Sequence, residues 1–324
     1  MKKLPIVLLG LVCLAVFIIF PFCVKALDSR DETAKKSTYS AIIDVWQLDM
    51  VEGGKGSRKS FLESYSKSFE KENNVLVNVS IQTKFSAEEK MKNGIFPDVL
   101  SYSPGVDLPF ERLSVLNCES FGASYNNKNY AVCWGYGGYV IISKKGNNFK
   151  GNLYVSQNGY TQPLISYYLS EYRFENMKIC TPIDAYTNFL ADKNGVLIGT
   201  QRDLFRLSKR GIEIDAKILS SFSDIILYAS CLDNGNQKKD ISKKFVENLS
   251  KVSQKDLDSI GMISLNQKGL EIGNSELSVF NGYCPSLRLS AFTKDDDLSE
   301  LQTFLSDLEK SEEEKLNRIK NIVQ

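Results

Sequence analysis

The spacing of hydrophobic residues predicts alternating strands and helices from Tyr39 onward. Residues 41–48 (AIIDVWQL) are apolar and rich in β-branched side chains, which is typical of a buried strand. Apolar residues then recur at three- and four-residue spacing over 61–69, which predicts a helix with one apolar face, and Ser57 is its expected N-cap. The pattern continues as strand, helix and strand over residues 75–81, 86–94 and 97–103. This alternation predicts a parallel sheet with right-handed crossovers.

The same alternation returns in the second half of the chain, after a less regular aromatic stretch. Residues 130–145 are rich in strand-forming side chains, and residues 164–172 have a helical pattern. Further helices are expected over 181–195, 201–211 and 238–252, and further strands over 196–200 and 222–230. Near the C-terminus, an apolar stripe from Leu298 to Val323 predicts more helix. We interpret these stripes as faces that pack against a core.

The first 26 residues predict an export signal or a membrane anchor. Two lysines precede an uncharged apolar run from Leu4 to Val24, which is long enough to cross the ~30 Å hydrocarbon core of a membrane as a helix. The lysines are expected to stay in the cytoplasm, which places the rest of the chain on the extracellular face of the cytoplasmic membrane. The body either stays anchored there or is secreted after cleavage near Ala26. Residues 27–38 are polar and predict a tether.

Composition and charge narrow the range of functions. The chain has 324 residues, of which 43% are hydrophobic and 24% are charged, as in an ordinary globular protein. Its 40 basic and 39 acidic residues leave no basic surplus, so nucleic acid is not an expected partner. Because the chain contains no histidine, histidine triads and histidine metal sites are excluded. We expect neither a metal nor a cofactor.

Five cysteines follow the N-terminal segment: Cys118, Cys133, Cys180, Cys231 and Cys284. They are odd in number and form no CxxC motif, so they predict neither a disulfide framework nor a zinc site. Buried free thiols are the favoured interpretation, and a single bridge between Cys118 and Cys133 is the alternative.

The loop after the first predicted strand carries the strongest candidate chemistry. Its glycine-rich stretch at 53–60 (GGKGSRKS) does not have the spacing of a phosphate-binding loop. Asp49 and Glu52 follow a strand that contains Trp46, and two acids beside an aromatic ring suit glycoside hydrolysis. The same groups also bind sugars without cutting them, because carboxylates accept hydrogen bonds from hydroxyl groups and ring faces stack on sugar C–H surfaces. We favour binding and keep hydrolysis as the alternative.

Four segments, taken in chain order, are similar to one known family. They are VWQLDMVEGGKGSRKSFLESYSKSFEKEN (45–73), FPDVLSY (96–102), AYTNFLADKNGVLIGTQRDLFRLSKRG (185–211), and the helix at 238–252 leading to IGMISL (260–265). Together they resemble the extracellular solute-binding proteins of ABC importers, family 1, the sugar-type group that includes maltose-binding protein.

The resemblance implies an α/β, two-lobed periplasmic-binding-protein-like fold, in which each lobe is a mostly parallel sheet flanked by helices. Crossings between the lobes are expected near Cys133, Tyr228 and Gly261. The resulting lobes would be 39–130 with 229–260 (lobe 1) and 131–228 with 261–324 (lobe 2). The chain would be a monomer that binds a small-molecule solute, a sugar in this family, and delivers it to ABC permease subunits without catalysing a reaction.

The resemblance also implies which residues face the ligand. The candidates are Trp46, Asp49, Glu52, Tyr102, Trp134, Tyr136, Arg202 and Asp203. They come from the first strand and its loop, from the end of the Pro-Asp strand, from the first crossing, and from the turn after the strand at 196–200. Each has a plainer alternative: Trp46 is equally suited to the core, and Arg202 with Asp203 to a local helix-end pair.

Two departures from the family pattern keep other functions open. The second lobe is short, and no clear lipid-attachment motif precedes the body, which favours a protein anchor. The alternatives are a glycan-acting hydrolase that uses Asp49 and Glu52, and a membrane-anchored sensor or interaction module on the same fold.

Overall fold

A computed structural model describes most of the chain after the N-terminal segment. The described residues are 39–50, 53–156, 174–219, 222–235, 237–265, 272–285, 287–307, 309–311, 313–315 and 317–318. The predicted anchor and tether, and the predicted helix at 164–172, lie outside them. Within the described ranges, no helix is long and apolar enough to span a membrane. The chain divides into two compact units at Ser40, and the architecture below is that of the unit beginning at Ala41.

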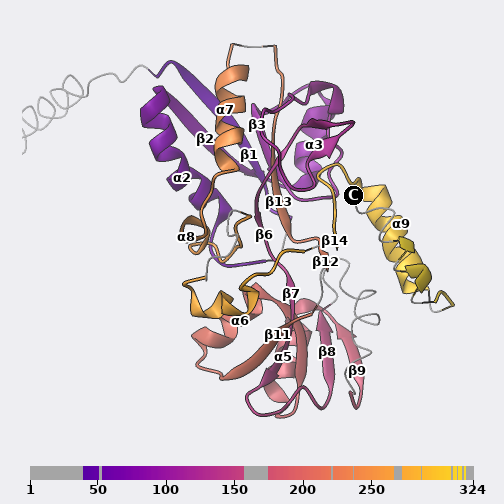
Figure 1. Cartoon of the computed structure of the whole chain (residues 1–324). Coiled ribbons are helices and arrows are strands. Elements are labelled where there is room, and N and C mark those ends of the chain that lie inside the picture. The colour runs from indigo at the N-terminus through magenta and orange to yellow at the C-terminus, as the bar shows by residue number, and fades with distance from the viewer. Residues whose placement is uncertain are drawn as a thin grey trace, which may run out of the picture. The chain divides into compact units, whose positions relative to one another are not determined.

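The first sheet is mostly parallel, as the strand and helix alternation predicts. Its strand order is β2-β1-β3-β13-β6 (Figure 1). These strands span Val75–Gln82 (β2), Ala41–Leu48 (β1), Val99–Tyr102 (β3), Ile226–Cys231 (β13) and Val132–Tyr136 (β6). β1 pairs in parallel with both β2 and β3, and β13 runs antiparallel between β3 and β6. We call this sheet and the elements packed on it lobe 1.

Helices cover both faces of the first sheet, because successive strand residues point to opposite sides. The helices are α2 (Arg58–Asn73), α3 (Lys84–Lys92), α7 (Lys239–Leu249) and the short α8 (Gln254–Leu257). α2 and α7 share a core with Ile43 and Val45 of β1, whereas α3 packs on the face of Trp46. α2 begins at Ser57, whose hydroxyl accepts a hydrogen bond from the Ser60 amide, as expected of an N-cap.

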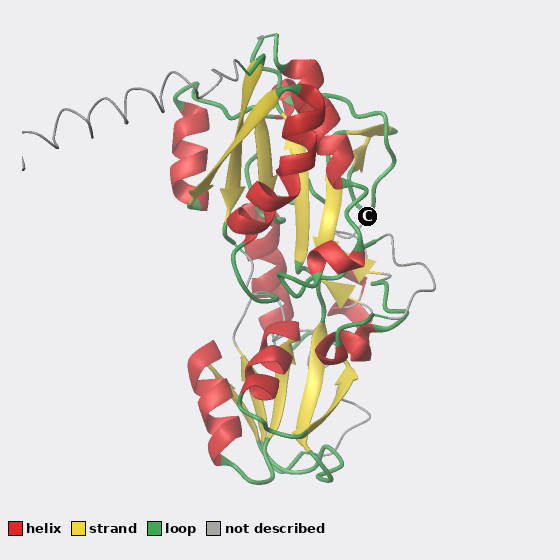
Figure 2. Ribbon diagram, turned by 90° about the vertical axis from the view of Figure 1, so that its left-hand side faces the viewer, coloured by secondary structure: helices red, strands yellow, loops and turns green. Residues whose placement is uncertain are grey.

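The second sheet forms lobe 2 and is also mostly parallel. Its strand order is β11-β7-β10-β8-β9. These strands span Ile214–Ile218 (β11), Tyr139–Lys144 (β7), Val196–Thr200 (β10), Leu153–Ser156 (β8) and Met177–Cys180 (β9). Helices α5 (Pro182–Ala191) and α6 (Gln201–Lys209) share a core with Val140 and Leu197, so they cover one face of this sheet. Figure 2 shows helices flanking the sheets of both lobes. The predicted two-lobed α/β fold is confirmed.

In its described part, the chain passes between the lobes four times. β6 leads through Gly137 into β7, and β12 (Phe222–Ser223) leads back into β13. The third passage runs through Ile263 to the 3₁₀ helix η2 (Ser275–Phe280), and the fourth leads to β14 (Leu287–Arg288). Tyr136 bridges to Ile263, and β12 pairs in parallel with β14, so the passages are joined to one another.

The segment after the fourth passage lies in a different lobe from the one expected. Helix α9 (Asp295–Ser306) contacts lobe 1 through a 2.6 Å ion pair between Asp295 and Lys84, and the Gly105 amide donates to the Thr293 carbonyl at 2.8 Å. The sequence predicted lobe 2 for this segment. An apolar stripe predicts a buried helix face but does not say which core buries it, and the passage before it is short and has no periodicity.

Smaller elements complete lobe 1. They are the 3₁₀ helix η1 (Phe110–Arg112) and a hairpin of β4 (Ser124–Tyr125) and β5 (Lys128–Asn129). The hairpin turn contains Asn126 and Asn127, both with positive φ, which is the asparagine-tolerated conformation of tight hairpin turns.

Candidate ligand-binding site between the lobes

The carboxyl ends of the parallel strands in both lobes lie next to the passages between them. In lobe 1, β6 ends at Tyr136, directly before the first passage. In lobe 2, Thr200 at the end of β10 pairs with Tyr139 at the start of β7, directly after that passage. Ligands of open α/β sheets bind beyond the carboxyl ends of strands, where loops and helix N-termini converge. This edge is therefore the candidate site.

The loop after β1 supplies the lobe 1 side of the site. Arg58 donates to Asp49 Oδ1 at 2.6 Å and to the Gly53 carbonyl at 3.0 Å, so it holds both ends of the loop together. Burial lowers the pKa of the Arg58 guanidinium, and the carboxylate of Asp49 opposes that effect. Asp49 keeps 61% of its side chain exposed, which leaves its carboxylate accessible for hydrogen bonds. Glu52 lies outside the described residues.

A glycine brings this loop against the segment after α8. Gly54 has φ +68°, and a Cβ there would lie 2.1 Å from the Ile260 carbonyl oxygen, so only glycine fits. The amide of the next residue, Lys55, donates to that same carbonyl at 2.7 Å. Lys55 Nζ in turn lies 4.3 Å from the centre of the Phe205 ring in α6. The loop of lobe 1 therefore contacts a helix of lobe 2.

The N-terminus of α6 supplies the lobe 2 side. Thr200 and Asp203 form a capping box, in which the Thr200 amide donates to Asp203 Oδ2 at 3.0 Å. Asp203 also pairs with Arg206 at 3.5 Å. Burial raises the pKa of the Asp203 carboxyl, and the hydrogen bond from Thr200 opposes that effect. The positive charge of Arg202 also lowers the pKa of Arg58, less than burial does.

Gln201 closes the side of the site next to the first passage. Its side chain is fully buried, accepts a 3.3 Å hydrogen bond from the Gly138 amide and contacts Met262 Sδ at 3.5 Å. A Cβ at Gly137 would lie 1.9 Å from Gln201 Nε2, so a larger residue there would force the buried Gln201 side chain to move. We call this passage, with the paired Gly137 and Gly138 and the buried side-chain amide of Gln201, the pivot.

Three of the eight predicted site residues lie at the interlobe edge. They are Asp49, Arg202 and Asp203. They come from the loop after β1 and from the first turn of α6. Asp203 is engaged in the capping box, as the plainer alternative predicted, whereas Asp49 keeps an exposed carboxylate. Asp49 and Arg202 are therefore the better candidates for direct contact with a solute.

The four predicted aromatic residues are packed inside the protein. Trp46 is 8% exposed and has Lys90 Nζ 5.2 Å from its ring centre. Tyr102 is fully buried, and its hydroxyl is hydrogen-bonded to Ser230 Oγ at 3.0 Å. Burial raises the pKa of the Tyr102 hydroxyl. Both rings belong to the apolar core of lobe 1 on the side of α3.

Trp134 and Tyr136 come from β6 and lie on its two sides. Trp134 stacks on Phe61 of α2 at 5.4 Å, and its Nε1 donates to Ser101 Oγ at 3.2 Å. Tyr136 donates to the carbonyl of Tyr283 at 2.6 Å. Through these contacts, both side chains pack inside the protein. A sequence shows that an aromatic residue lies at a crossing, but the direction of its side chain depends on the register of the sheet.

Lys55, Arg58, Gln201 and Phe205 are further residues of this edge that the sequence-based reasoning did not select. One signal was available in the sequence: Thr200 followed three residues later by Asp203 is a capping pattern that marks the start of a helix directly after a strand. No local signal predicts that Arg58 bonds back to Asp49 or that Phe205 meets Lys55, because these contacts join separate elements.

The chain shows no sign of metal or disulfide chemistry in its described part. Among the described residues, no cluster of three or more cysteines and carboxylates is arranged to hold a metal ion. The five cysteines that the structure describes are free, so the alternative bridge between Cys118 and Cys133 is not formed. Burial raises the pKa of the Cys133 thiol to about 12, which makes it a poor nucleophile.

Comparison with solved structures identifies proteins of similar fold. The sugar-binding protein MalE from Xanthomonas citri matches with a TM-score of 0.63 and 11% identity, over 87% of this chain and 96% of that protein. Maltose-bound MalE from Listeria monocytogenes matches with a TM-score of 0.55 and 13% identity, over 87% and 97%. The likeness is one of fold. Iron-bound HitA from Pseudomonas aeruginosa, which holds a different ligand, matches with a TM-score of 0.54 and 10% identity, over 82% and 100%.

At identities of 10 to 13%, these similarities show the fold alone. No protein-family model matches the chain, and no curated protein matches it by sequence. The ligand must therefore be argued from the residues of this chain.

Proposed function

We propose that this protein is the extracellular solute-binding component of an ABC importer and that it binds a carbohydrate-type solute between its lobes. One observation carries the proposal. The loop after β1 and the N-terminal part of α6 face each other across the pivot, and Lys55 Nζ of the loop lies over the ring of Phe205 in α6. A solute that contacts both sides binds the closed arrangement more tightly than the open one, so it shifts the lobes toward closure.

Asp49 and Arg202 are the proposed direct contacts. A carboxylate accepts hydrogen bonds from sugar hydroxyl groups, and a guanidinium donates to their oxygens. Arg58 holds Asp49 in position through the 2.6 Å ion pair. Glu52 is proposed to join this set from the same loop. Trp46, Tyr102, Trp134 and Tyr136 are proposed to shape the surrounding walls through their packing.

The proposed partners and location follow from the same function. The solute-loaded protein would dock on ABC permease subunits at the extracellular face of the cytoplasmic membrane, acting as a monomer. The N-terminal segment would hold it there as an anchor or be removed by cleavage near Ala26. Nucleic acid is not a proposed partner, because the charge of the chain is balanced.

Calorimetric titration with maltose, maltotriose, amino acids and polyols tests the proposal. We expect one or more sugars to bind, and Arg202→Ala and Asp49→Ala each to weaken binding by about tenfold, since each removes a hydrogen bond to the solute worth about 1.5 kcal/mol. Arg210→Ala is the matched control, because Arg210 is an exposed residue at the opposite end of the same helix. Absence of binding and of thermal stabilisation across the panel would overturn transport binding.

We also propose that the protein has no catalytic step. Glycoside hydrolysis would need a second carboxyl group acting with Asp49, which is itself ion-paired with Arg58. The sugar-bound proteins of similar fold are named as binding proteins, which supports this view. Incubation with maltotriose should therefore leave the sugar intact. Turnover that disappears in Asp49→Asn or Glu52→Gln would establish the hydrolase instead.

A further inference from the structure

A cavity lies next to the pivot, on the side of β6 away from Gln201. We call it the cavity behind the pivot. Gly137 faces Gln201, whereas the preceding residue, Tyr136, lines the cavity, as expected for neighbouring residues of an extended segment. The cavity has a volume of about 940 Å³. Its walls come from the hairpin region of lobe 1 and from segments that link the lobes.

Three of the four passages between the lobes contribute to this cavity. Tyr136 belongs to the first passage, Ser264 to the third and Tyr283 to the fourth. Tyr136 exchanges backbone hydrogen bonds of 2.9 and 2.8 Å with Ile263, and its hydroxyl donates to the Tyr283 carbonyl at 2.6 Å. Tyr136 therefore joins all three passages at the cavity wall. A molecule bound there contacts the segments that must move when the lobes close.

Aromatic and uncharged polar groups dominate the lining. The rings of Phe121 and Tyr283 lie 6.4 and 6.1 Å from the ring of Tyr136. The polar groups are hydroxyls and amides from Ser120, Ser124, Asn127 and Asn129. Among the described lining residues the charged groups are one acid, Glu119, and one base, Lys251. Ring faces beside amides and hydroxyls suit a neutral, hydroxyl-rich ligand with apolar C–H faces, which is the chemistry of a sugar.

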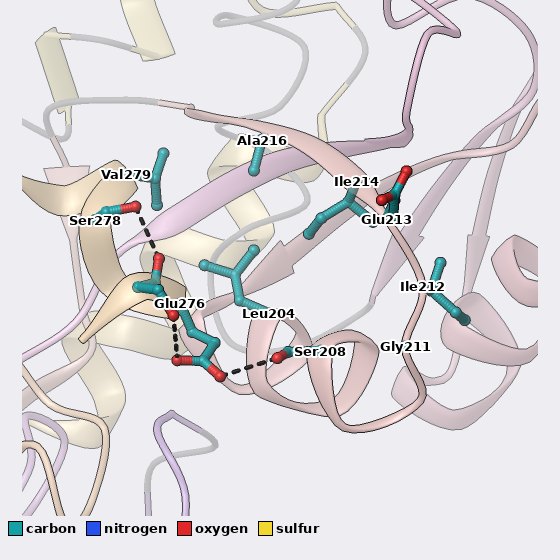
Figure 3. A pocket seen from close by; sticks show the side chains of 11 residues that line it. Leu204, Ser208, Gly211, Ile212, Glu213, Ile214, Ala216, Glu276, Ser278 and Val279 are labelled. Carbon is teal, nitrogen blue, oxygen red and sulfur yellow. Dashed lines mark hydrogen bonds between the residues drawn. The ribbon is translucent and has the colours of Figure 1, made fainter.

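A hollow in lobe 2 provides a contrast. It has a volume of about 580 Å³ and lies between α6, β11 and η2 (Figure 3). Leu204, Ile214, Ala216 and Val279 line it, and Glu276 accepts a 2.9 Å hydrogen bond from Ser208 at its rim. Its described lining contains no aromatic ring, so it lacks the stacking surfaces that a sugar requires.

We propose that the cavity behind the pivot is a second carbohydrate site, separate from the site between the lobes, and that its occupancy acts on lobe closure. A sugar stacked on the partly exposed ring of Tyr283, which packs against the buried Tyr136, and hydrogen-bonded to the hairpin binds one arrangement of the three passages better than another. It thereby shifts the equilibrium between open and closed lobes. By reciprocity, a solute between the lobes alters the affinity of the second site.

Alkylation of Cys284 measures occupancy of this cavity directly. Cys284 is an exposed, free thiol on the cavity wall, and the free, half-buried thiol of Cys180 at the end of β9 serves as an internal control. The full chain is treated with iodoacetamide with and without maltotriose, and modification is located by peptide mass spectrometry. At about ten times the Kd we expect Cys284 to react about tenfold more slowly, because only the empty site reacts, and Cys180 to react at its original rate.

Three variants separate ligand contact from lobe closure. Ser124→Trp places an indole at the exposed hairpin wall and should abolish the protection of Cys284, whereas Ser278→Trp at the lobe 2 hollow should preserve it. Arg202→Ala weakens the proposed interlobe site and should leave the protection in place. Protection that disappears in Arg202→Ala and persists in Ser124→Trp would report closure alone and would overturn the second site.

The outcomes also distinguish this site from the proposed function. If calorimetry detects sugar binding while Cys284 stays unprotected, the second site is overturned and the transport function stands. If Cys284 is still protected in Arg202→Ala, with an affinity for maltotriose that differs from that of the unchanged protein, the second site and its coupling to the site between the lobes are supported independently. If maltotriose neither gives heat nor protects Cys284, both the second site and sugar binding are overturned for this ligand.

Discussion

The two sheets share one plan but are assembled from the chain in different ways. In each, three parallel strands stand in the order second, first, third, followed by an antiparallel strand and a fifth strand (β2-β1-β3-β13-β6 and β9-β8-β10-β7-β11). Lobe 2 takes its strands from one continuous stretch, between Tyr139 and Ile218. Lobe 1 is completed by β13, which pairs between β3 and β6 and follows all the strands of the lobe 2 sheet in the chain.

This difference shows in the side chains that secure each lobe. In lobe 1, Asp98 before β3 is 3% exposed, accepts from the Asp44 amide at 2.9 Å and pairs with Lys238 at 2.6 Å. It therefore ties β1 and β3 to the segment that follows β13. In lobe 2, the partly exposed Asp192 at the C-terminus of α5 accepts from Asn152 and Tyr154, which lie 40 and 38 residues earlier, at β8 of the same continuous stretch. The discontinuous lobe depends on a buried long-range ion pair, and the continuous lobe does not.

The largest effect is expected from Asp98→Ala. Removing the buried carboxylate takes the acceptor from the Asp44 amide and the ion-pair partner from Lys238, which keeps its 3.0 Å bond to the Ile42 carbonyl, and should cost about 3 kcal/mol of unfolding free energy. Denaturant titration measures the loss, and hydrogen exchange should show peptides of lobe 1 opening first. Asp192→Ala is the matched control, with a smaller loss confined to lobe 2. Earlier opening of lobe 2 in Asp98→Ala would contradict the contrast between the lobes.

Gly137→Ala tests the passage that joins the two lobes. The added Cβ meets the buried Gln201 amide, and we expect a loss of about 2 kcal/mol from overpacking. The double variant Gly137→Ala with Gln201→Ser should recover part of that loss, since the shorter side chain clears the space. A double-mutant cycle with no coupling energy would show that the two residues do not meet.

Thr200→Ala tests the local order of lobe 2 at the candidate site. Loss of the capping hydroxyl should cost about 1 kcal/mol, and Thr200→Ser should restore most of it. Thermal unfolding provides the measurement. Thr303→Ala in α9 is the control, because Thr303 is exposed and its hydroxyl bonds only to the preceding turn. Equal losses of stability in Thr200→Ala and Thr303→Ala would show that the Thr200 cap contributes no more than an ordinary exposed threonine.

The smallest effect concerns pH and Asp192. Hydrogen bonds lower the pKa of Asp192 below its ordinary value of 3.8, and the bond from Asn152 has the largest effect. The carboxylate therefore contributes stability above about pH 4 that is lost as the pH falls through the lowered pKa. Asp192→Asn should flatten the decline of the denaturation midpoint in this acid range. If the denaturation midpoint of Asp192→Asn still falls with decreasing pH as it does in the unchanged protein, other carboxylates cause that fall.

Much of the fold could be predicted from local pattern. The helix after the N-cap Ser57, the helix at 201–211 and the strands at 41–48 and 196–200 were expected from periodicity and capping residues. The structure has them at 58–73, 201–209, 41–48 and 196–200. The candidate site was predicted less completely. Asp49 and Arg202 lie at the interlobe edge, but Tyr102 and Trp134 are buried, because their side chains follow the register and faces of a sheet assembled from distant segments.

The sequence by itself determined the alternation of strands and helices and the absence of histidine chemistry, because periodicity and composition are properties of neighbouring residues and residue counts. The two α/β lobes were expected from the resemblance to the solute-binding family. Only the tertiary structure decided that α9 returns to lobe 1, that a fourth passage pairs β12 with β14, and that Tyr136 lines a cavity behind the pivot. These outcomes depend on contacts between residues far apart in the chain. Their energies come from burial and register and leave no local signature in the sequence.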